Sequence, residues 1–249
     1  MNKQIVLVIR KFDKFSALLM ENGFGVINFP TIETIPVKEF DEFDKELADI
    51  CKYDGVFLTS VVAAEIFLAR FNRSKIFKGQ IFTLGKRTKQ LFDAENIEVF
   101  FDEKANTASD LIALLSPDDW RNKRFLFPCG DKSLRVVAEK LANIAEVKEV
   151  IVYQTVKPEI NKKLFDKIEA RLINREINFV CFFSPSGIEN FLEIFGGRFL
   201  SKIKIAAIGE TTAQKAREND LIIGFVSTRT NAEIFAGEFI EYLRTKSIE

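Results

Sequence analysis

The chain has 249 residues, with 36 Lys plus Arg against 36 Asp plus Glu and no histidine. Without histidine there is no Ser-His-Asp or Cys-His nucleophile, no His-ligated metal and no imidazole proton shuttle. A formal net charge of zero gives no electrostatic case for general binding to nucleic acid or to anionic membranes, because both need a basic surplus. We therefore expect neither partner, although a local basic cleft is compatible with this balance.

The cysteines and the apolar runs indicate a cellular compartment. The chain has an odd number of cysteines, Cys51, Cys129 and Cys181. They lie far apart and outside any Cys-x-x-Cys pattern, as expected for reduced thiols. The apolar run at residues 5–9 is shorter than the roughly 7 to 15 residues of a signal h-region, and no stretch approaches the ~20 residues of a membrane span. We predict a cytoplasmic protein without a membrane segment.

Short runs of β-branched and aromatic residues alternate with segments of helical period along the chain. This alternation predicts strand, helix, strand units built around parallel sheets, and therefore an α/β protein. In chain order, the clearest strands are expected at residues 4–9, 55–58, 80–84, 124–127, 147–153, 179–183 and 204–208.

Two further segments look like linkers. Residues 29–36 and 152–158 are β-prone and end in proline, which restricts both its own backbone and that of the preceding residue to extended forms. Two such strands could run side by side between domains. The residues alone leave open whether the domains are the halves 1–120 and 121–249 or an exchanged arrangement.

The same pattern occurs twice in the chain. Thr59 and Ser184, each after a buried run and before a helical stretch, lie 125 residues apart, and Gly85 and Gly209 lie 124 apart. The opening strand at residues 5–10 matches residues 125–130 in the same way. The order and spacing of these blocks favour two copies of one α/β unit, with a cleft between them, over chance similarity of generic strand and helix units.

The turns after the strands are the expected binding positions. In open parallel sheets, ligands bind beyond the carboxyl ends of strands, where helix N-termini present free N–H groups. Ser184-Pro185-Ser186-Gly187 and Gly209-Glu210-Thr211-Thr212 both suit an anion at a helix N-terminus, and simple helix capping explains them equally well.

The first copy repeats these turns. Thr59-Ser60 occupies the position of Ser184, and Gly85-Lys86-Arg87-Thr88 adds two cations to the second turn. Arg10 follows the opening strand, and such basic residues are more often solvated than ligand-bound. Together the turns describe a cleft lined by hydroxyls, N–H groups and scattered cations, which suits a ligand with many carboxylates.

Common cofactor motifs are missing from the sequence. It has no Gly-x-Gly-x-x-Gly fingerprint, no Walker A motif, no Gly-x-Ser-x-Gly nucleophile elbow and no acidic metal loop, so no nucleotide, flavin or metal is expected. Tyr153, on the second linker strand, could hydrogen-bond a ligand between the domains, and half-buried packing is the alternative.

These motifs together resemble the uroporphyrinogen-III synthase family, and the resemblance runs over nearly the whole chain. The matching segments are residues 6–10, 57–60, 84–88, 127–131, 152–155, 183–187 and 206–212. Each segment is short and degenerate, whereas their order and spacing are fairly specific. Glu210 stands where proline is common in the family, and we expect its carboxylate to point away from the substrate.

The resemblance implies two similar flavodoxin-like or Rossmann-like parallel-sheet domains, joined by a two-strand linker, with a cleft between them. The exchanged arrangement then applies. One domain comprises residues 1–29 and 159–249, the other comprises residues 37–150, and residues 30–36 and 151–158 form the linker strands.

The activity that the resemblance implies is that of a cytoplasmic, monomeric lyase without a cofactor. It would convert hydroxymethylbilane, a linear tetrapyrrole polycarboxylate, to uroporphyrinogen III in heme biosynthesis, with loss of water, inversion of ring D and macrocycle closure. Closure without an enzyme gives the uninverted isomer, so the task is mainly one of positioning and needs no nucleophile. Tyr153 matches the family tyrosine proposed to assist departure of the hydroxyl.

The residues expected to bind substrate all come from the turns. They are Arg10, Thr59, Ser60, Gly85, Lys86, Thr88, Ser184, Ser186, Gly187, Gly209, Thr211 and Thr212. The alternative function is a non-catalytic two-domain sensor of an anionic metabolite. A sugar or nucleotide transferase would need a Gly-rich diphosphate loop, which the sequence lacks.

Overall fold

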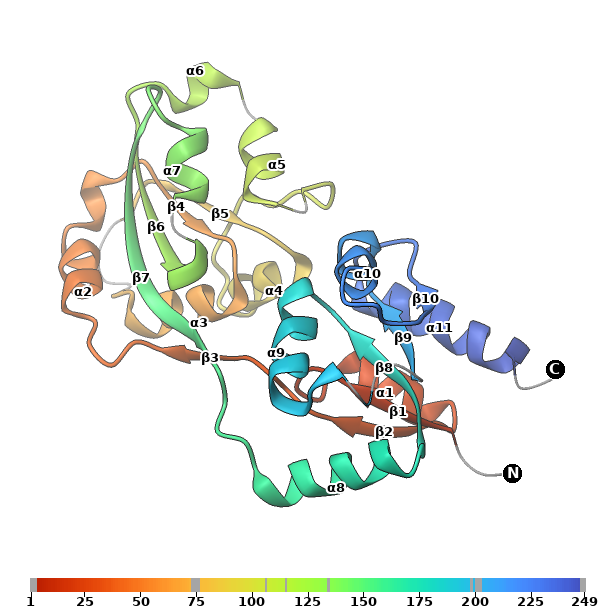
Figure 1. Ribbon diagram of the computed structural model, residues 1–249. Coiled ribbons are helices and arrows are strands. Elements are labelled where there is room, and N and C mark those ends of the chain that lie inside the picture. Colours follow the sequence, from red (N-terminus) through yellow and green to blue (C-terminus); the bar gives the residue numbers. More distant parts are fainter. Residues whose placement is uncertain are drawn as a thin grey trace. The chain divides into compact units, whose positions relative to one another are not determined.

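The chain folds into two compact α/β units in the computed structural model, which describes residues 4–72, 77–105, 107–114, 116–133, 135–197, 199 and 203–246 (Figure 1). Unit 1 combines Met1–Glu33 with Lys157–Glu249, and unit 2 is the continuous segment Thr34–Val156. Unit 1 is therefore assembled from two segments that are far apart in the sequence.

Unit 1 has a five-stranded sheet in the order β10-β9-β8-β1-β2, whose strands pair in parallel. Its elements are β1 (Ile5–Val8), α1 (Lys14–Glu21), β2 (Gly25–Asn28), α8 (Lys162–Ile173), β8 (Ile177–Phe182), α9 (Pro185–Phe195), β9 (Lys204–Ala207), α10 (Glu210–Arg217), β10 (Ile223–Val226) and α11 (Ala232–Lys246).

Helices cover both faces of this sheet, so its central strands are buried on both sides, as is usual for parallel sheets. On one face, α8, α9 and α10 pack on β1, β8 and β9 through side chains such as Phe182 and Phe191. On the other face, α1 and α11 contribute Phe15, Phe235 and Phe239. Burying a phenylalanine side chain stabilises the fold by about 1.5–3 kcal/mol, so these clusters account for much of the unit's stability.

Unit 2 has a five-stranded sheet in the order β3-β7-β6-β4-β5, in which β4, β5, β6 and β7 pair in parallel. Its elements are β3 (Glu33–Pro36), α2 (Asp41–Ala48), a 3-10 turn (Ile50–Lys52), β4 (Gly55–Leu58), α3 (Val61–Arg70), β5 (Gln80–Thr83), α4 (Lys86–Ala94), α5 (Ala108–Ala113), α6 (Pro117–Trp120), β6 (Arg124–Gly130), a 3-10 turn (Asp131–Ser133), α7 (Val136–Lys140) and β7 (Glu146–Val156).

The core of unit 2 also lies on both sheet faces. One cluster joins α2, α3 and α4 to the sheet and includes Phe43, Phe67 and Leu126. The opposite cluster joins α5, α6 and α7 to it and includes Trp120 and Phe127. Successive residues of a strand point to opposite faces, and Leu126 and Phe127 accordingly belong to opposite clusters.

The two sheets repeat one strand order, as the sequence repeat predicted. The matched strands β8 and β4, β9 and β5, and β1 and β6 occupy corresponding positions in the orders β9-β8-β1-β2 and β5-β4-β6-β7. Even β10, which has no full counterpart, corresponds to a single parallel bridge between Phe82 and Phe100 at the edge of unit 2.

Some boundaries differ from the expected ones. Residues 33–36 and 151–156, expected in linker strands, lie in β3 and β7 of the unit 2 sheet, where these two strands are neighbours. The helical stretch expected after Ser184 begins at Pro185, because proline suits the first helical position and Ser184 caps the helix. In the parts of the chain that the structure describes, no helix is both long and apolar enough to cross a membrane.

Candidate functional site

The predicted binding residues lie at the carboxyl edges of the two sheets. In unit 1, β1, β8 and β9 lead to Arg10, Ser184 and Gly209, and in unit 2, β4 and β5 lead to Thr59 and Gly85. Neighbouring parallel strands end on the same edge, so the structure brings the turn residues of each unit together along that edge.

Ser184 caps helix α9 in unit 1. Its backbone is extended, and its Oγ accepts a hydrogen bond from the Gly187 N–H at 3.1 Å. The hydroxyl of Ser186 lies 3.1 Å from the same Oγ, and Ser186 is exposed whereas Gly187 is buried. The Ser184 hydroxyl therefore fixes the turn, and the exposed Ser186 hydroxyl is the side-chain group available to a ligand.

Helix α10 begins after Gly209, which is buried in an extended backbone conformation. A Cβ at Gly209 would lie 2.8 Å from Thr230 Cγ2, so close packing explains the glycine. Thr211 is exposed, whereas Thr212 is only 3% exposed and faces the core. A cavity of about 520 Å³ beside the turn is lined by Pro185, Glu210, Thr211, Gln214, Lys215 and Glu218.

The charged residues of this edge are held by local partners. Arg10 forms a 3.1 Å ion pair with Asp13, and its guanidinium lies 4.3 Å from the centre of the Phe183 ring. Glu210 pairs with Arg217 at the other end of α10, so its carboxylate is directed away from the helix N-terminus.

The edge of unit 2 has the same construction. Ser60 caps α3 by accepting from the Ala63 N–H at 3.1 Å, and Thr59 before it is partly exposed. Gly85 precedes α4 with φ of +82°, a left-handed conformation that favours glycine. Lys86 is exposed, and its Nζ lies 3.0 Å from Oε1 of Glu103. Thr88 is only 2% exposed and is buried like its counterpart Thr212 in unit 1.

The helix N-termini, more than the hydroxyls, are the shared chemical feature of these edges. Helices α3, α4, α9 and α10 each start at a predicted turn. The first N–H groups of a helix lack internal partners and carry a partial positive charge, so they bind carboxylates. Because the buried Thr88 and Thr212 present no hydroxyl to solvent, these two positions can contribute only backbone groups.

Tyr153 lies near the end of β7 in unit 2 and is 9% exposed. Its ring packs in the cluster with Val150 and Val152, and it contacts Gly130 of the neighbouring strand. Among the described residues, none forms a hydrogen bond with the Tyr153 hydroxyl, so this group is available as a donor.

Two neighbours of Tyr153 were not among the expected site residues. Gly130 pairs with Tyr153 in the sheet, and the Asp131 carboxylate accepts a hydrogen bond from the Thr155 N–H at 2.9 Å. The sequence repeat matches residues 125–130 to the opening strand at residues 5–10. This match places Gly130 at the end of a strand, where binding residues were expected.

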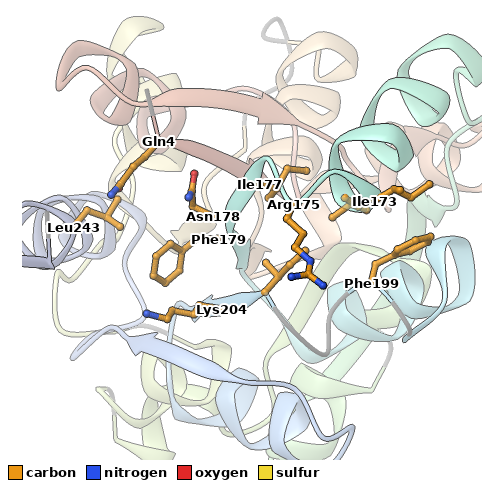
Figure 2. Close-up of a pocket in the computed structure, with 11 residues that line it drawn as sticks. Gln4, Ile173, Arg175, Ile177, Asn178, Phe179, Phe199, Lys204 and Leu243 are labelled. Atoms are coloured by element: carbon orange, nitrogen blue, oxygen red, sulfur yellow. The ribbon is translucent and has the colours of Figure 1, made fainter. Parts of the chain in front are cut away.

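Two cavities lie at the opposite, amino edges of the sheets. One in unit 1 has a volume of about 600 Å³ and includes Gln4, Asn178, Phe179 and Lys204 (Figure 2). One in unit 2, of about 570 Å³, includes Tyr53 and other residues before β4, β5 and β6. No predicted site residue lines either cavity.

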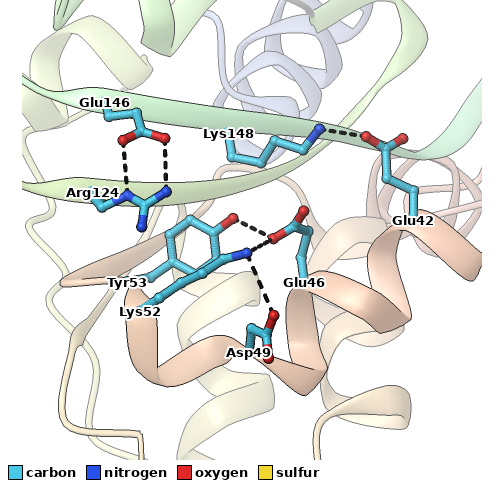
Figure 3. A network of polar contacts seen from close by, with 8 residues as sticks. All are labelled: Glu42, Glu46, Asp49, Lys52, Tyr53, Arg124, Glu146 and Lys148. Atoms are coloured by element: carbon cyan, nitrogen blue, oxygen red, sulfur yellow. Dashed lines mark hydrogen bonds and ion pairs between the residues drawn. The ribbon is translucent and has the colours of Figure 1, made fainter.

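A polar network also stabilises the amino edge of unit 2 (Figure 3). The buried Tyr53 hydroxyl donates to Glu46 at 2.6 Å, and Lys52 lies 2.6 Å from the same carboxylate oxygen. Burial would raise the pKa of Glu46, but hydrogen bonds from Lys52 and Tyr53 outweigh it and lower that pKa. Around this centre, Arg124 pairs with Glu146, and Lys148 pairs with Glu42.

Known proteins similar to this chain indicate its family. The family model described as uroporphyrinogen-III synthase HemD matches residues 13–235. The uroporphyrinogen-III synthase of Chlorobaculum parvum is 26% identical over 234 residues, covering 91% of this chain and 92% of that protein. The synthase of Synechococcus elongatus is 24% identical over 217 residues, covering 82% and 81%.

Solved structures show the same fold. A mutant uroporphyrinogen III synthase from Thermus thermophilus aligns with a TM-score of 0.62 at 16% identity, covering 97% of this chain and 99% of that chain. The uroporphyrinogen-III synthetase of Helicobacter pylori gives a TM-score of 0.62 at 16% identity, covering 96% and 99%. Because the family model spans elements of both units, from α1 to α11, this chain belongs to the uroporphyrinogen-III synthase family.

Proposed function

We propose that this protein is a uroporphyrinogen-III synthase, a lyase that needs no cofactor. Its substrate is hydroxymethylbilane, which it converts to uroporphyrinogen III with loss of water, inversion of ring D and closure of the macrocycle. The observation that carries the proposal is the family match over residues 13–235, which includes the turns of both sheets. The alternative of a non-catalytic sensor is not favoured by these comparisons.

The turns supply the groups that a polycarboxylate needs. We propose that substrate carboxylates bind the N–H groups at the starts of α3, α4, α9 and α10 that the Ser60 and Ser184 caps leave free. The exposed hydroxyls of Ser186 and Thr211 add hydrogen bonds, and Arg10 and Lys86 add charge. Several weak contacts of this kind hold a flexible chain in one conformation, which converts ring closure into a positioned intramolecular step.

Tyr153 is proposed to assist the departure of the substrate hydroxyl. Its own hydroxyl has no hydrogen-bond partner among the described residues, and the ring is fixed by packing. A phenol held in this way donates a hydrogen bond to the leaving oxygen, whose basicity rises as its bond to carbon breaks. The hydroxyl leaves as water with the tyrosine proton, and the cation that remains on the tetrapyrrole cyclises and gives a proton back to the tyrosinate.

The proposal is tested by supplying hydroxymethylbilane, oxidising the products and measuring the ratio of type III to type I isomer with and without the protein. We expect the type III isomer to predominate only when the protein is present. A ratio that the protein does not change would refute the proposed function. Tyr153→Phe should slow turnover by roughly 10²- to 10⁴-fold, the usual contribution of general acid catalysis.

The matched control for that variant is Tyr242→Phe, which removes the hydroxyl of a tyrosine on α11 of unit 1. We expect this control to keep the wild-type rate. If Tyr153→Phe also keeps the wild-type rate, Tyr153 has no catalytic role, whatever the isomer ratio shows.

We further propose that the protein acts as a cytoplasmic monomer. None of its three cysteines is in a disulfide, which is typical of a reducing compartment. Light scattering coupled to size exclusion should give the mass of one 28.5 kDa chain. A mass of twice that value would contradict the monomer.

A further inference from the structure

The register between β6 and β7 changes beside Tyr153. Residues pair in steady steps from Arg124 with Glu146 to Cys129 with Ile151, and then Gly130 pairs with Tyr153. Val152 is therefore an extra residue in β7, which forms a β-bulge. A bulge changes the direction of the side chains that follow it and is often found next to active sites.

The bulge places Tyr153 on a different face of the sheet from the one that alternation predicts. Val150 and Val152 lie in the cluster beneath α2, α3 and α4, so strict alternation would place Tyr153 on the opposite face. Instead the Tyr153 ring packs in the same cluster as both valines. That is also the face toward which a Gly130 side chain would project, because Leu126, four residues earlier on β6, belongs to this cluster.

Gly130 leaves the space that the Tyr153 ring occupies. A Cβ built on Gly130 would lie 2.6 Å from Cζ and 2.9 Å from Oη of Tyr153, and closer still to Cε2. Real Cβ atoms are not found at such distances, so any side chain at residue 130 displaces the phenol. Both residues are buried, which restricts the directions in which the ring could move.

Asp131 holds the strand just after the bulge. Its carboxylate accepts the Thr155 N–H at 2.9 Å, two residues beyond Tyr153. Tyr153 is thus fixed by Gly130 beneath its ring and by the contact between Asp131 and Thr155 beyond the bulge.

We propose that Gly130, supported by Asp131, is a positioning residue for Tyr153 in the reaction. The inference rests on the proposed function. The absence of a side chain at residue 130 sets the position of the phenol oxygen, and a methyl group there moves that oxygen away from the leaving hydroxyl. Such a displacement affects the chemical step more than substrate binding, because the carboxylates bind at the turns.

The test compares Gly130→Ala in the wild-type and in the Tyr153→Ala background. In the wild-type background we expect kcat to fall roughly 10- to 100-fold with little change in KM, as for a misplacement of about 1 Å. In the Tyr153→Ala background, where no ring remains to be displaced, the same substitution should change kcat by less than about twofold. Gly25→Ala is the control, since its Cβ would meet Ile5 Cγ1 at 3.2 Å in a parallel strand of unit 1, and it should keep the wild-type kcat.

Two kinetic results would overturn the inference: an unchanged kcat in Gly130→Ala, or equal losses in both backgrounds. If Gly130→Ala does not fold, Asp131→Ala takes its place, with the same expected dependence on Tyr153 and with rescue by Asp131→Asn, which keeps an acceptor oxygen. Equal losses from Asp131→Ala in both backgrounds would likewise overturn it. Wild-type protein that yields no type III isomer refutes the proposed function itself, whereas normal wild-type activity with unaffected variants refutes only the role of Gly130.

Discussion

Removing the Tyr53 hydroxyl should destabilise unit 2 in a pH-dependent way. Tyr53 is 5% exposed, and its hydroxyl donates to the Glu46 carboxylate at 2.6 Å. Burial, together with the hydrogen bond and charge of Glu46, raises the pKa of Tyr53 well above its ordinary value, so the phenol keeps its proton and remains a donor. Tyr53→Phe deletes this donor and leaves the ring packing in place.

The expected cost at pH 7 is about 1.5 kcal/mol of the free energy of unfolding. Hydrogen bonds to charged groups contribute about 1.5–3 kcal/mol, and the lower value applies because Lys52 still pairs with the same oxygen. The pKa of Glu46 is lowered in the fold, so its contribution is complete above the unfolded pKa of about 4.3 and is lost as pH falls through the folded pKa. The cost of Tyr53→Phe should therefore shrink in acid.

Urea unfolding followed by tryptophan fluorescence measures this effect. The chain has one tryptophan, Trp120, which is 2% exposed and lies in unit 2 with Tyr53. Tyr242→Phe, in unit 1, is the control and should leave the Trp120 transition unchanged. A Tyr53→Phe transition equal to the wild type at pH 7, or a cost that is the same at pH 7 and in acid, would show that the hydrogen bond to charged Glu46 does not stabilise the unit.

Two further predictions concern the thiols and a turn. Cys51 is exposed, whereas burial raises the pKa of Cys129 to about 12 and also raises the pKa of Cys181 well above its ordinary value, so Ellman's reagent should titrate one thiol rapidly and the other two only in denaturant. Rapid reaction of two or more thiols in the native protein would contradict this. Gly85→Ala should destabilise unit 2 by about 1–2 kcal/mol, because φ at Gly85 is +82°. Gly85→Asn should cost as much, since ψ at Gly85 is 141° and lies outside the left-handed helical region that asparagine tolerates, and equal Trp120 unfolding curves for all three proteins would argue against backbone strain.

The sequence was sufficient to predict the features that depend on local pattern. Short apolar runs marked β4 and β8, and serines directly before helical stretches marked the caps of α3 and α9 at Ser60 and Ser184. The similar offsets of the matched blocks, such as Gly85 and Gly209, indicated two copies of one α/β unit, and the structure shows two sheets with one strand order. These features are specified by neighbouring residues, so no knowledge of long-range pairing was needed.

Features that depend on register were beyond the sequence. An alternating pattern predicts the opposite face for Tyr153, and the bulge at Val152 is visible only once β6 and β7 are paired. The burial of Thr88 and Thr212 was also missed, because a hydroxyl in the first turn of a helix reads equally well as a cap or as a ligand group. Similarly, nothing local to Tyr53 identifies Glu46, on α2, as its partner.

The position of β1 inside the unit 1 sheet has a consequence during protein synthesis. β1 pairs on one side with β2, which follows soon after it, and on the other side with β8, where Val6 lies opposite Phe179. At roughly 5–20 residues per second, that second edge stays open for about eight to thirty seconds after β2 has emerged from the ribosome. The continuous unit 2 can fold in this interval, while the apolar edge at residues 5–8 waits unpaired. β1 is therefore translated long before β8 but completes its sheet only when β8 arrives, and the nascent chain is most exposed to misassociation at this strand.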